Sequence, residues 1–357
     1  MKILVIQQKR IGDVLTSTLI SNNLKKKFPA AEVDYMCYSN CVAVLKNNPN
    51  ISNIIVLEEK VRKNYLSLFK FIQKIRKSKY DVVIDAYCKL ETNLITYFSG
   101  ANTRISYHKG YSNFFYNHNV LRYKNGSKSK LGLAIENRLL LLKPIIKEEI
   151  TDYKPKIFLT ESEIKETETL LKSFGIASTK KPLILFGILG SEWYKTYPLE
   201  KMAQIIDFTV EKLDADIIFN YIPSQKEEAM KVFNFCKPNT QKNIHFDLYS
   251  QGLRPFLALL SRCSMLIGNE GGSVNMAKAL DVPTFSIFSP SVDKETWQIF
   301  ENEKENESIH LKDLKPEIYK QHDDKFIKEN TFKYFDEYPL ELILKKLEVF
   351  FETNKLL

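Results

Sequence analysis

Two loops place charged residues and glycine directly after an apolar run, where a protein of mixed strands and helices can bind a ligand. In the first loop, Lys9, Arg10 and Asp13 follow the apolar residues 2–6. An acidic residue at this place commonly caps a helix or faces its positive end, and Asp13 on its own indicates no other role. Three charges after a buried strand, however, indicate that something polar binds there.

The second loop runs through the sequence G-N-E-G-G-S at residues 268–273, between an apolar run and a predicted helix. Glycine lets the backbone approach a ligand closely, and a helix N-terminus offers free N–H groups and positive potential. The pattern suits a diphosphate, although a tight turn without a ligand would use the same residues. It matches neither a Walker loop nor a G-x-G-x-x-G sequence.

A third pattern, Asp214-Ala215-Asp216, resembles the D-x-D sequence that holds a divalent cation in many enzymes. Here it precedes a predicted strand, so it lies at the amino end of the sheet, away from the edge where ligands bind. We interpret it as a turn.

Alternating strand and helix patterns position these loops. Strands are predicted at residues 2–6, 33–38, 54–57 and 81–85, and again at 183–187, 216–221, 244–246, 265–267 and 284–288. Helical periodicity lies between them, including residues 61–77, and a less regular region precedes a helix near 129–142. This alternation predicts two parallel, doubly wound α/β sheets, whose carboxyl ends would face a cleft.

The length of 357 residues also favours two domains. Polar, proline-containing stretches at 151–155 and 178–182 are candidate boundaries, and we place the boundary at 175. The expected division is an acceptor-binding domain at 1–175, a second domain at 176–335, and a helix at 336–357 that packs back on the first domain.

The composition of the chain limits the classes of partner that it is expected to bind. The chain has 52 Lys and Arg against 43 Asp and Glu, a net charge of +9 that favours anionic partners or simply solvates the surface. No basic tail or nucleic-acid module is evident. The five cysteines form no C-x-x-C pair, and no apolar run reaches the length of a membrane span, so we expect a cytoplasmic protein.

Three segments together carry a family resemblance. Residues 9–15 read K-R-I-G-D-V-L where the family has S-S-L-G-D-V-L, and residues 195–198 read K-T-Y-P for K-R-W-P. Residues 268–283 read G-N-E-G-G-S-V-N-M-A-K-A-L-D-V-P for G-N-D-S-G-x-x-H-L-A-A-A-L-G-V-P. In this order and spacing, the chain resembles glycosyltransferase family 9, the bacterial heptosyltransferases.

The resemblance implies a GT-B fold, with two Rossmann-like domains facing a central cleft, and inverting sugar transfer without a metal or other cofactor. The implied donor is a nucleotide-diphosphate sugar, ADP-heptose, and the acceptor is an anionic lipid-linked glycan of the lipopolysaccharide core or a related cell-envelope glycan. The implied location is the cytoplasm, with the positive charge permitting peripheral contact with the inner membrane. No nucleic acid is implied.

The resemblance also implies roles for individual residues. Asp13 would deprotonate the acceptor hydroxyl, and Lys195 would neutralise the departing diphosphate. The expected donor-binding residues are Gly12, Ser191, Gln225, Glu270, Gly271, Gly272, Ser273 and Asn275. We expect Lys9 and Arg10 to bind acidic groups of the acceptor.

Four positions depart from the family pattern. Lys9 and Arg10 replace a serine pair, Asn275 replaces His, Glu270 replaces Asp, and Gln225 replaces an acid. These four departures leave two alternatives open. One is a GT-B transferase that uses a UDP- or GDP-sugar, and the other is a non-catalytic sugar-binding relative. A nucleotide-dependent oxidoreductase is disfavoured, because no G-x-G-x-x-G follows the first strand.

Overall fold

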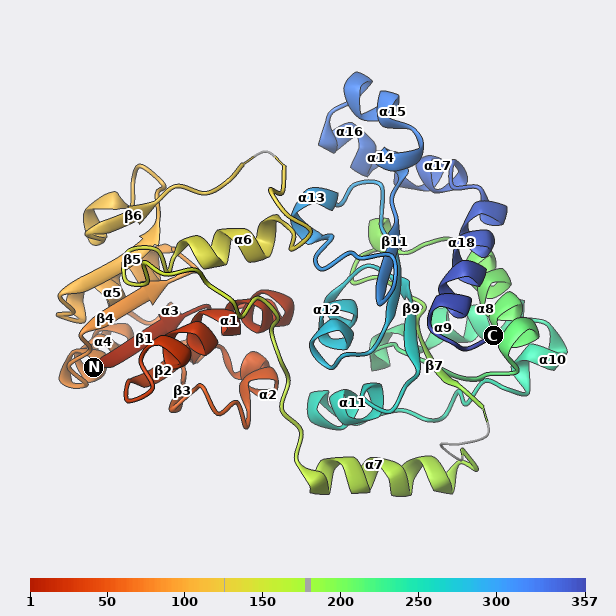
Figure 1. The fold of residues 1–357 in the computed structure, drawn as a ribbon, viewed down its shortest axis with the longest axis horizontal. Coiled ribbons are helices and arrows are strands. Elements are labelled where there is room, and N and C mark those ends of the chain that lie inside the picture. The colour runs from red at the N-terminus through yellow and green to blue at the C-terminus, as the bar shows by residue number, and fades with distance from the viewer. Residues whose placement is uncertain (125, 177–180) are drawn as a thin grey trace. The chain divides into compact units, whose positions relative to one another are not determined.

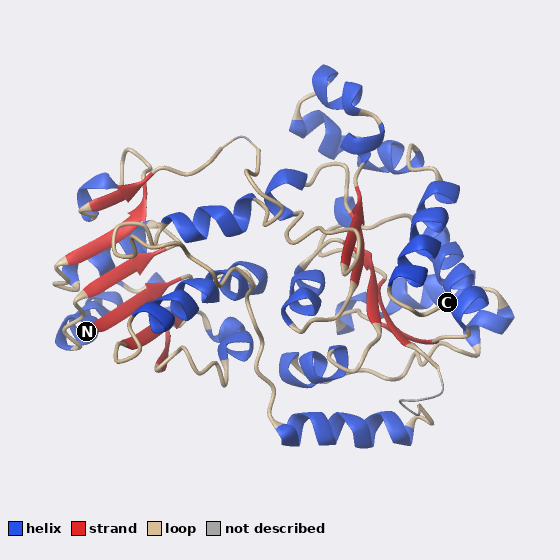
Figure 2. Cartoon of the chain, viewed as in Figure 1, coloured by secondary structure: helices blue, strands red, loops and turns tan. Residues whose placement is uncertain are grey.

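The computed structural model describes residues 1–124, 126–176 and 181–357 (Figure 1). The chain divides into two compact units, a first domain of Met1–Phe158 and a second domain of Leu159–Leu357. Each has its own parallel sheet with helices on both faces (Figure 2). The prediction of two doubly wound α/β domains is confirmed.

The first domain has six parallel strands in the order β3-β2-β1-β4-β5-β6. The strands are β1 (Lys2–Ile6), β2 (Glu32–Cys37), β3 (Asn53–Val56), β4 (Val82–Asp85), β5 (Thr103–Tyr107) and β6 (His118–Val120). The helices are α1 (Ile11–Lys27), α2 (Val42–Leu45), α3 (Glu59–Lys63), α4 (Tyr65–Lys77), α5 (Leu90–Phe98) and α6 (Leu133–Leu140).

Both faces of the first sheet are buried, which explains the continuous apolar run of β1. Leu4 and Ile6 pack against Leu68 and Ile72 of α4 in one core cluster. On the opposite face, the Tyr35 hydroxyl donates to the Val14 carbonyl of α1 at 3.0 Å. The central strand β1 is thereby fixed from both sides, and so is the loop that follows it.

The second domain has five parallel strands in the order β11-β10-β9-β7-β8. The strands are β7 (Leu183–Gly187), β8 (Asp216–Phe219), β9 (Met265–Asn269), β10 (Thr284–Ile287) and β11 (Asn306–Ile309). The helices are α7 (Glu161–Ser173), α8 (Leu199–Leu213), α9 (Lys226–Phe235), α10 (Pro238–Gln241), α11 (Leu253–Leu260), α12 (Gly272–Ala279), α13 (Lys294–Trp297), α14 (Leu311–Leu314), α15 (Pro316–Gln321), α16 (Asp324–Glu329), α17 (Thr331–Asp336) and α18 (Leu340–Thr353).

The domain boundary predicted at residue 175 lies instead at 158, near the stretch 151–155. The helix α7 between them belongs to the second domain, because it packs on α11. Thr160 and Glu163 form a capping box at its start, and Arg254 of α11 donates to Glu163 at 2.7 Å. This arginine lowers the pKa of Glu163 to about 2. The other candidate boundary includes residues 178–180, which lie outside the described residues.

The prediction that the last helix packs on the first domain is wrong. The apolar face of α18 lies in the core of the second domain, where Leu347 and Phe351 are fully buried. Phe351 stacks on Phe208 of α8, with ring centroids 6.4 Å apart. An apolar stripe predicts that a helix is covered, but does not say which sheet covers it.

No helix in the described parts of the chain combines the length and apolar character that a membrane span requires.

Candidate functional site

Each sheet has one point where the chain reverses its direction of travel across the strands. In the first sheet this point lies between β1 and β4, and in the second it lies between β7 and β9. Loops at the carboxyl ends of such strand pairs diverge and leave room for a ligand. The loops after β1, β7 and β9 hold most of the residues that the sequence indicated.

Asp13 lies in the first turn of α1 and faces a buried cation. Arg138 of α6 donates to Asp13 Oδ1 at 2.7 Å, and their side chains are 10% and 23% exposed for Arg138 and Asp13. The same guanidinium donates to the Ser17 hydroxyl at 2.8 Å and to the Ala134 carbonyl at 2.7 Å. Three contacts hold Arg138 in place, and it in turn fixes one oxygen of Asp13 while leaving that carboxylate partly open to solvent.

The expected acceptor-binding residues Lys9 and Arg10 are exposed in the loop between β1 and α1. Arg10 precedes the helix with a φ of 62°, a strained value for a non-glycine residue. Gly12 lies in the first turn of α1, in the first domain, whereas the other expected donor-binding residues belong to the second domain.

Basic residues also follow the neighbouring strands of the first sheet. Lys89 comes after β4, Lys109 after β5 and Arg122 after β6. Lys109 Nζ donates to the Cys88 carbonyl at 2.7 Å, and burial lowers its pKa. The carboxyl ends of parallel strands share one edge, so this edge of the first sheet is basic over much of its width.

In the second domain, close backbone contacts hold the loop after β7. A Cβ on Gly190 would lie 2.4 Å from the Lys195 carbonyl oxygen, and one on Gly268 would lie 2.3 Å from the Gly187 oxygen. Gly268 also has a φ of +142°, which side chains rarely tolerate. Asn269 then bridges the strands, since its side chain accepts from Tyr197 N at 2.7 Å and donates to the Gly187 carbonyl at 2.9 Å.

This framework brings Lys195 and Glu270 together. Lys195 ends the short 3₁₀ turn η3 (Trp193–Lys195), and its Nζ lies 3.7 Å from Glu270 Oε2, too far for a hydrogen bond. Glu270 Oε2 is buried and accepts no hydrogen bond from the described residues. Burial raises the pKa of Glu270, while the Lys195 ammonium opposes that rise. A buried acid without a hydrogen-bond partner destabilises a fold, which marks the pair as a candidate ligand site.

The N-terminus of α12 lies directly after Glu270. A Cβ on Gly271 would meet no protein atom within 4 Å, so packing within the protein does not demand glycine at that position. Gly272 is exposed and Ser273 is half-buried, in the first turn. Backbone N–H groups at this end are therefore open to an anion. Asn275 lies on the buried side of α12, with 6% of its surface exposed.

Two other expected donor-binding residues lie on the Lys195 loop or contact it. Ser191 is exposed on the loop itself. Gln225 ends η4 (Pro223–Gln225), and its Nε2 donates to the Gly190 carbonyl at 3.0 Å. This hydrogen bond from the Gln225 amide supports the loop that carries Lys195.

Three residues at these sites were not identified from the sequence. Arg138 is a buried cation on α6, whose sequence L-A-I-E-N-R-L-L also contains Glu136 and Asn137, so no sequence pattern marks it. Lys278 is buried on α12, where the family has Ala, and its Nζ donates to the Ile299 carbonyl at 2.6 Å. Trp193, adjacent to Tyr194 on η3, is 51% exposed and stacks on Phe332 at 5.4 Å between ring centroids.

The D-x-D pattern is a turn at the amino end of β8, as the sequence indicated. Asp214 has a φ of 48° and pairs with Lys181 at 2.6 Å, while Asp216 contacts His245 at 2.8 Å. Both carboxylates lie at the edge opposite Lys195 and Glu270.

Comparison with known proteins identifies a family and several relatives of this chain. The profile of glycosyltransferase family 9 (heptosyltransferase) matches residues 68–324, which include Lys195 and Glu270 but not Asp13. The lipopolysaccharide heptosyltransferase 1 of Campylobacter coli is 24% identical over 295 residues, covering 81% of this chain and 84% of that protein.

Two solved structures share the fold. The family 9 glycosyltransferase of Veillonella parvula DSM 2008 has a TM-score of 0.78 at 22% identity, covering 98% of this chain and 97% of the other. The ADP-heptose lps heptosyltransferase II of E. coli has a TM-score of 0.74 at 16% identity, covering 99% and 100%. The expected GT-B fold is confirmed, and the chain belongs to glycosyltransferase family 9, as a glycosyltransferase.

Proposed function

We propose that the chain is an inverting, metal-independent heptosyltransferase. It moves heptose from ADP-heptose onto an anionic acceptor glycan of the lipopolysaccharide core or a related cell-envelope glycan. The observation that carries the proposal is the Lys195–Glu270 pair beside the open N-terminus of α12. The name of the E. coli relative with the same fold, an ADP-heptose lps heptosyltransferase, supports the choice of donor.

The leaving diphosphate poses the larger charge problem in this reaction. As the bond from the anomeric carbon to the diphosphate oxygen breaks, negative charge grows on that oxygen. The Lys195 ammonium and the N–H groups at the start of α12 supply positive potential for it, which a bound cation supplies in other enzymes. Glu270, whose Oε2 lies 3.7 Å from that ammonium, is proposed to accept a hydrogen bond from a sugar hydroxyl.

The acceptor requires a base. In the proposed step the acceptor oxygen bonds to the anomeric carbon, and its proton passes to the carboxylate of Asp13. Arg138 keeps one carboxylate oxygen oriented, so the other is available to the hydroxyl. Lys9 and Arg10 are proposed to bind acidic groups of the acceptor, and the basic residues after β4, β5 and β6 extend the same charge.

Transfer assays with a panel of donors test the proposal. We expect turnover with ADP-heptose and a heptose-accepting lipopolysaccharide core, and we expect that turnover to persist in excess EDTA. Turnover only with a UDP- or GDP-sugar would support the alternative GT-B transferase. Loss of activity in EDTA, restored by a divalent cation, would contradict the metal-independent mechanism.

Two glycines of the same turn should separate ligand binding from folding. Gly271→Ala adds a methyl group that meets no protein atom, so it should leave the melting temperature unchanged and weaken ADP binding about tenfold. Gly268→Ala should instead destabilise the protein by about 3 kcal/mol, because it adds backbone strain and a close contact. Thermal melts and calorimetric titration with ADP measure both effects. If Gly271→Ala binds ADP normally, the diphosphate does not lie at this turn.

A further inference from the structure

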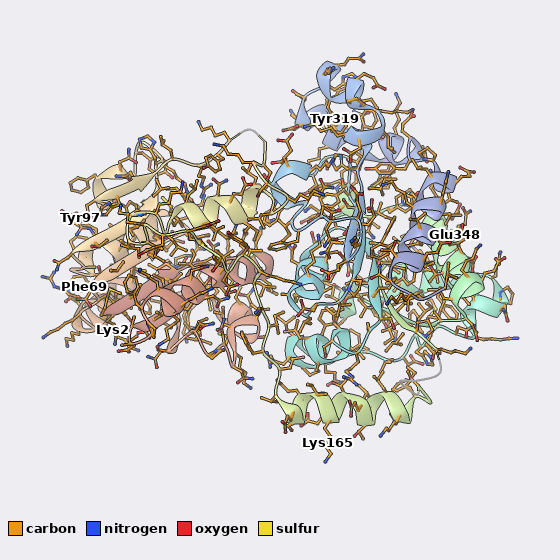
Figure 3. All side chains as sticks on the ribbon, in the orientation of Figure 1. Lys2, Phe69, Tyr97, Lys165, Tyr319 and Glu348 are labelled. Carbon is orange, nitrogen blue, oxygen red and sulfur yellow. The ribbon has the colours of Figure 1, made fainter. Side chains whose placement is uncertain are left out.

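Helix α4 exposes large apolar side chains that the fold does not use. Tyr65, Leu66 and Phe69 are 90%, 76% and 59% exposed. Figure 3 shows Phe69 at the periphery of the first domain. The opposite side of the same helix packs Leu68 and Ile72 into the core. The exposed residues are therefore not needed to hold α4 in place.

The stretch of chain that carries these side chains is basic. Residues 60–80 contain eight Lys or Arg and no Asp or Glu. On α4, Lys70, Lys74, Arg76 and Lys77 are exposed, and no carboxylate of the described residues pairs with them. The ordinary surface of this chain mixes both signs, since it has 52 basic and 43 acidic residues in all.

We propose that this surface, formed by Tyr65, Leu66 and Phe69 with Lys70 and Lys74, docks the protein on an anionic phospholipid bilayer. Apolar and aromatic side chains on one helix enter the boundary between headgroups and acyl chains, while lysines contact anionic headgroups. A second copy of this chain fits poorly, because a two-fold contact through this surface would place the same uncompensated lysines against each other.

The surface adjoins the proposed acceptor side. The break between α3 and α4 is fixed by Asn64, whose side chain accepts from Ser67 N at 3.0 Å, so Tyr65 follows closely on α3. Arg62 of α3 lies 3.8 Å from Glu91, which accepts from the Tyr38 hydroxyl at 3.4 Å. The backbone N–H of Tyr38 donates to the Gln8 carbonyl at 2.9 Å, so α3 lies close to the loop that holds Lys9. A bilayer bound at α4 thus lies close to the loop proposed to bind a lipid-linked acceptor.

Vesicle co-sedimentation tests the proposal without any substrate, so its failure is distinguishable from failure of the proposed transfer reaction. The full chain should bind vesicles of phosphatidylglycerol and phosphatidylcholine, bind phosphatidylcholine vesicles more weakly, and lose binding as salt rises. K70E/K74E should reduce binding about tenfold or more. The control K165E/K172E reverses the same number of exposed lysines on α7 and should bind like wild type.

A second pair of variants tests how much the exposed apolar side chains of α4 contribute to vesicle binding. L66S/F69S should also weaken vesicle binding severalfold, whereas L170S/V349S, which removes two exposed apolar residues of the second domain, should not. Equal binding by K70E/K74E and its control would overturn the proposal. So would a wild-type protein that ignores mixed vesicles but forms a dimer that L66S/F69S dissociates, because the surface would then belong to a second copy.

Discussion

Asp13→Asn should lower the turnover number for sugar transfer about a thousandfold, the range expected for loss of a general base, while ADP binding stays nearly unchanged. Asparagine keeps the shape of the side chain and an oxygen that can accept the hydrogen bond from Arg138. It cannot take the proton of the acceptor hydroxyl. The effect should therefore fall on kcat rather than on the stability of the protein or its affinity for the donor.

The main alternative is that Asp13 is structural, because a carboxylate in the first turn of a helix beside a buried arginine stabilises that helix. Ser17→Ala is the matched control. It removes another contact of the Arg138 guanidinium, at 2.8 Å, and leaves the carboxylate intact. We expect Ser17→Ala to alter the melting temperature slightly and to retain turnover within a few-fold.

Kinetics and thermal melts on the three proteins separate the two roles. A purely structural Asp13 would give an Asn variant with a lower melting temperature and near-normal kcat at a temperature where it stays folded. That outcome would remove Asp13 from the mechanism and require another base at the edge that holds Lys9 and Lys109.

The sheets were predictable wherever strands are buried on both faces. Residues 2–6 and 183–187 coincide with β1 and β7, because continuous apolar runs bounded by polar loops have few other interpretations. The strands β5, β6 and β11 were missed. They carry polar residues such as Arg104, Asn119 and Glu307, which interrupt the apolar pattern.

Local polar contacts explain other differences. The predicted helix at 61–77 is broken at Asn64, which caps α4 with its side chain. The strand predicted at 244–246 is reduced to a single bridge from Ile244 to Ile217. A helical or strand pattern says that residues share a face, but not whether a neighbouring side chain competes for the backbone.

The motif residues of the candidate site were predictable from the sequence, whereas the residues that contact them were not. Asp13, Lys195 and Glu270 lie at the carboxyl edges where the strand pattern placed them. Arg138 comes from a helix 125 residues away from Asp13, and no spacing within the sequence joins the two. The role of Gln225 in holding the Gly190 carbonyl also depends on tertiary contacts that a motif does not encode.

Lys195→Met should lower kcat/KM about a hundredfold or more, since removing one preorganised positive partner of a developing anion commonly has that effect. Lys195 is the only charged side chain of the described residues within ion-pair distance of Glu270, at 3.7 Å. Because the diphosphate is charged before the bond breaks, ADP binding should weaken as well. Lys201→Met is the control, since Lys201 is similarly half-buried but pairs with Asp336 on another part of the domain.

The Lys195 variant alone is ambiguous, because it also leaves Glu270 buried without its nearest cation, which destabilises a protein. The double variant Lys195→Met with Glu270→Gln removes both charges and should recover the melting temperature. If Lys195 acts on the leaving group, the double variant regains stability and stays as slow as Lys195→Met. If instead turnover returns with stability, the lysine only neutralises Glu270, and the charge on the departing diphosphate must be stabilised by the N-terminus of α12 without it.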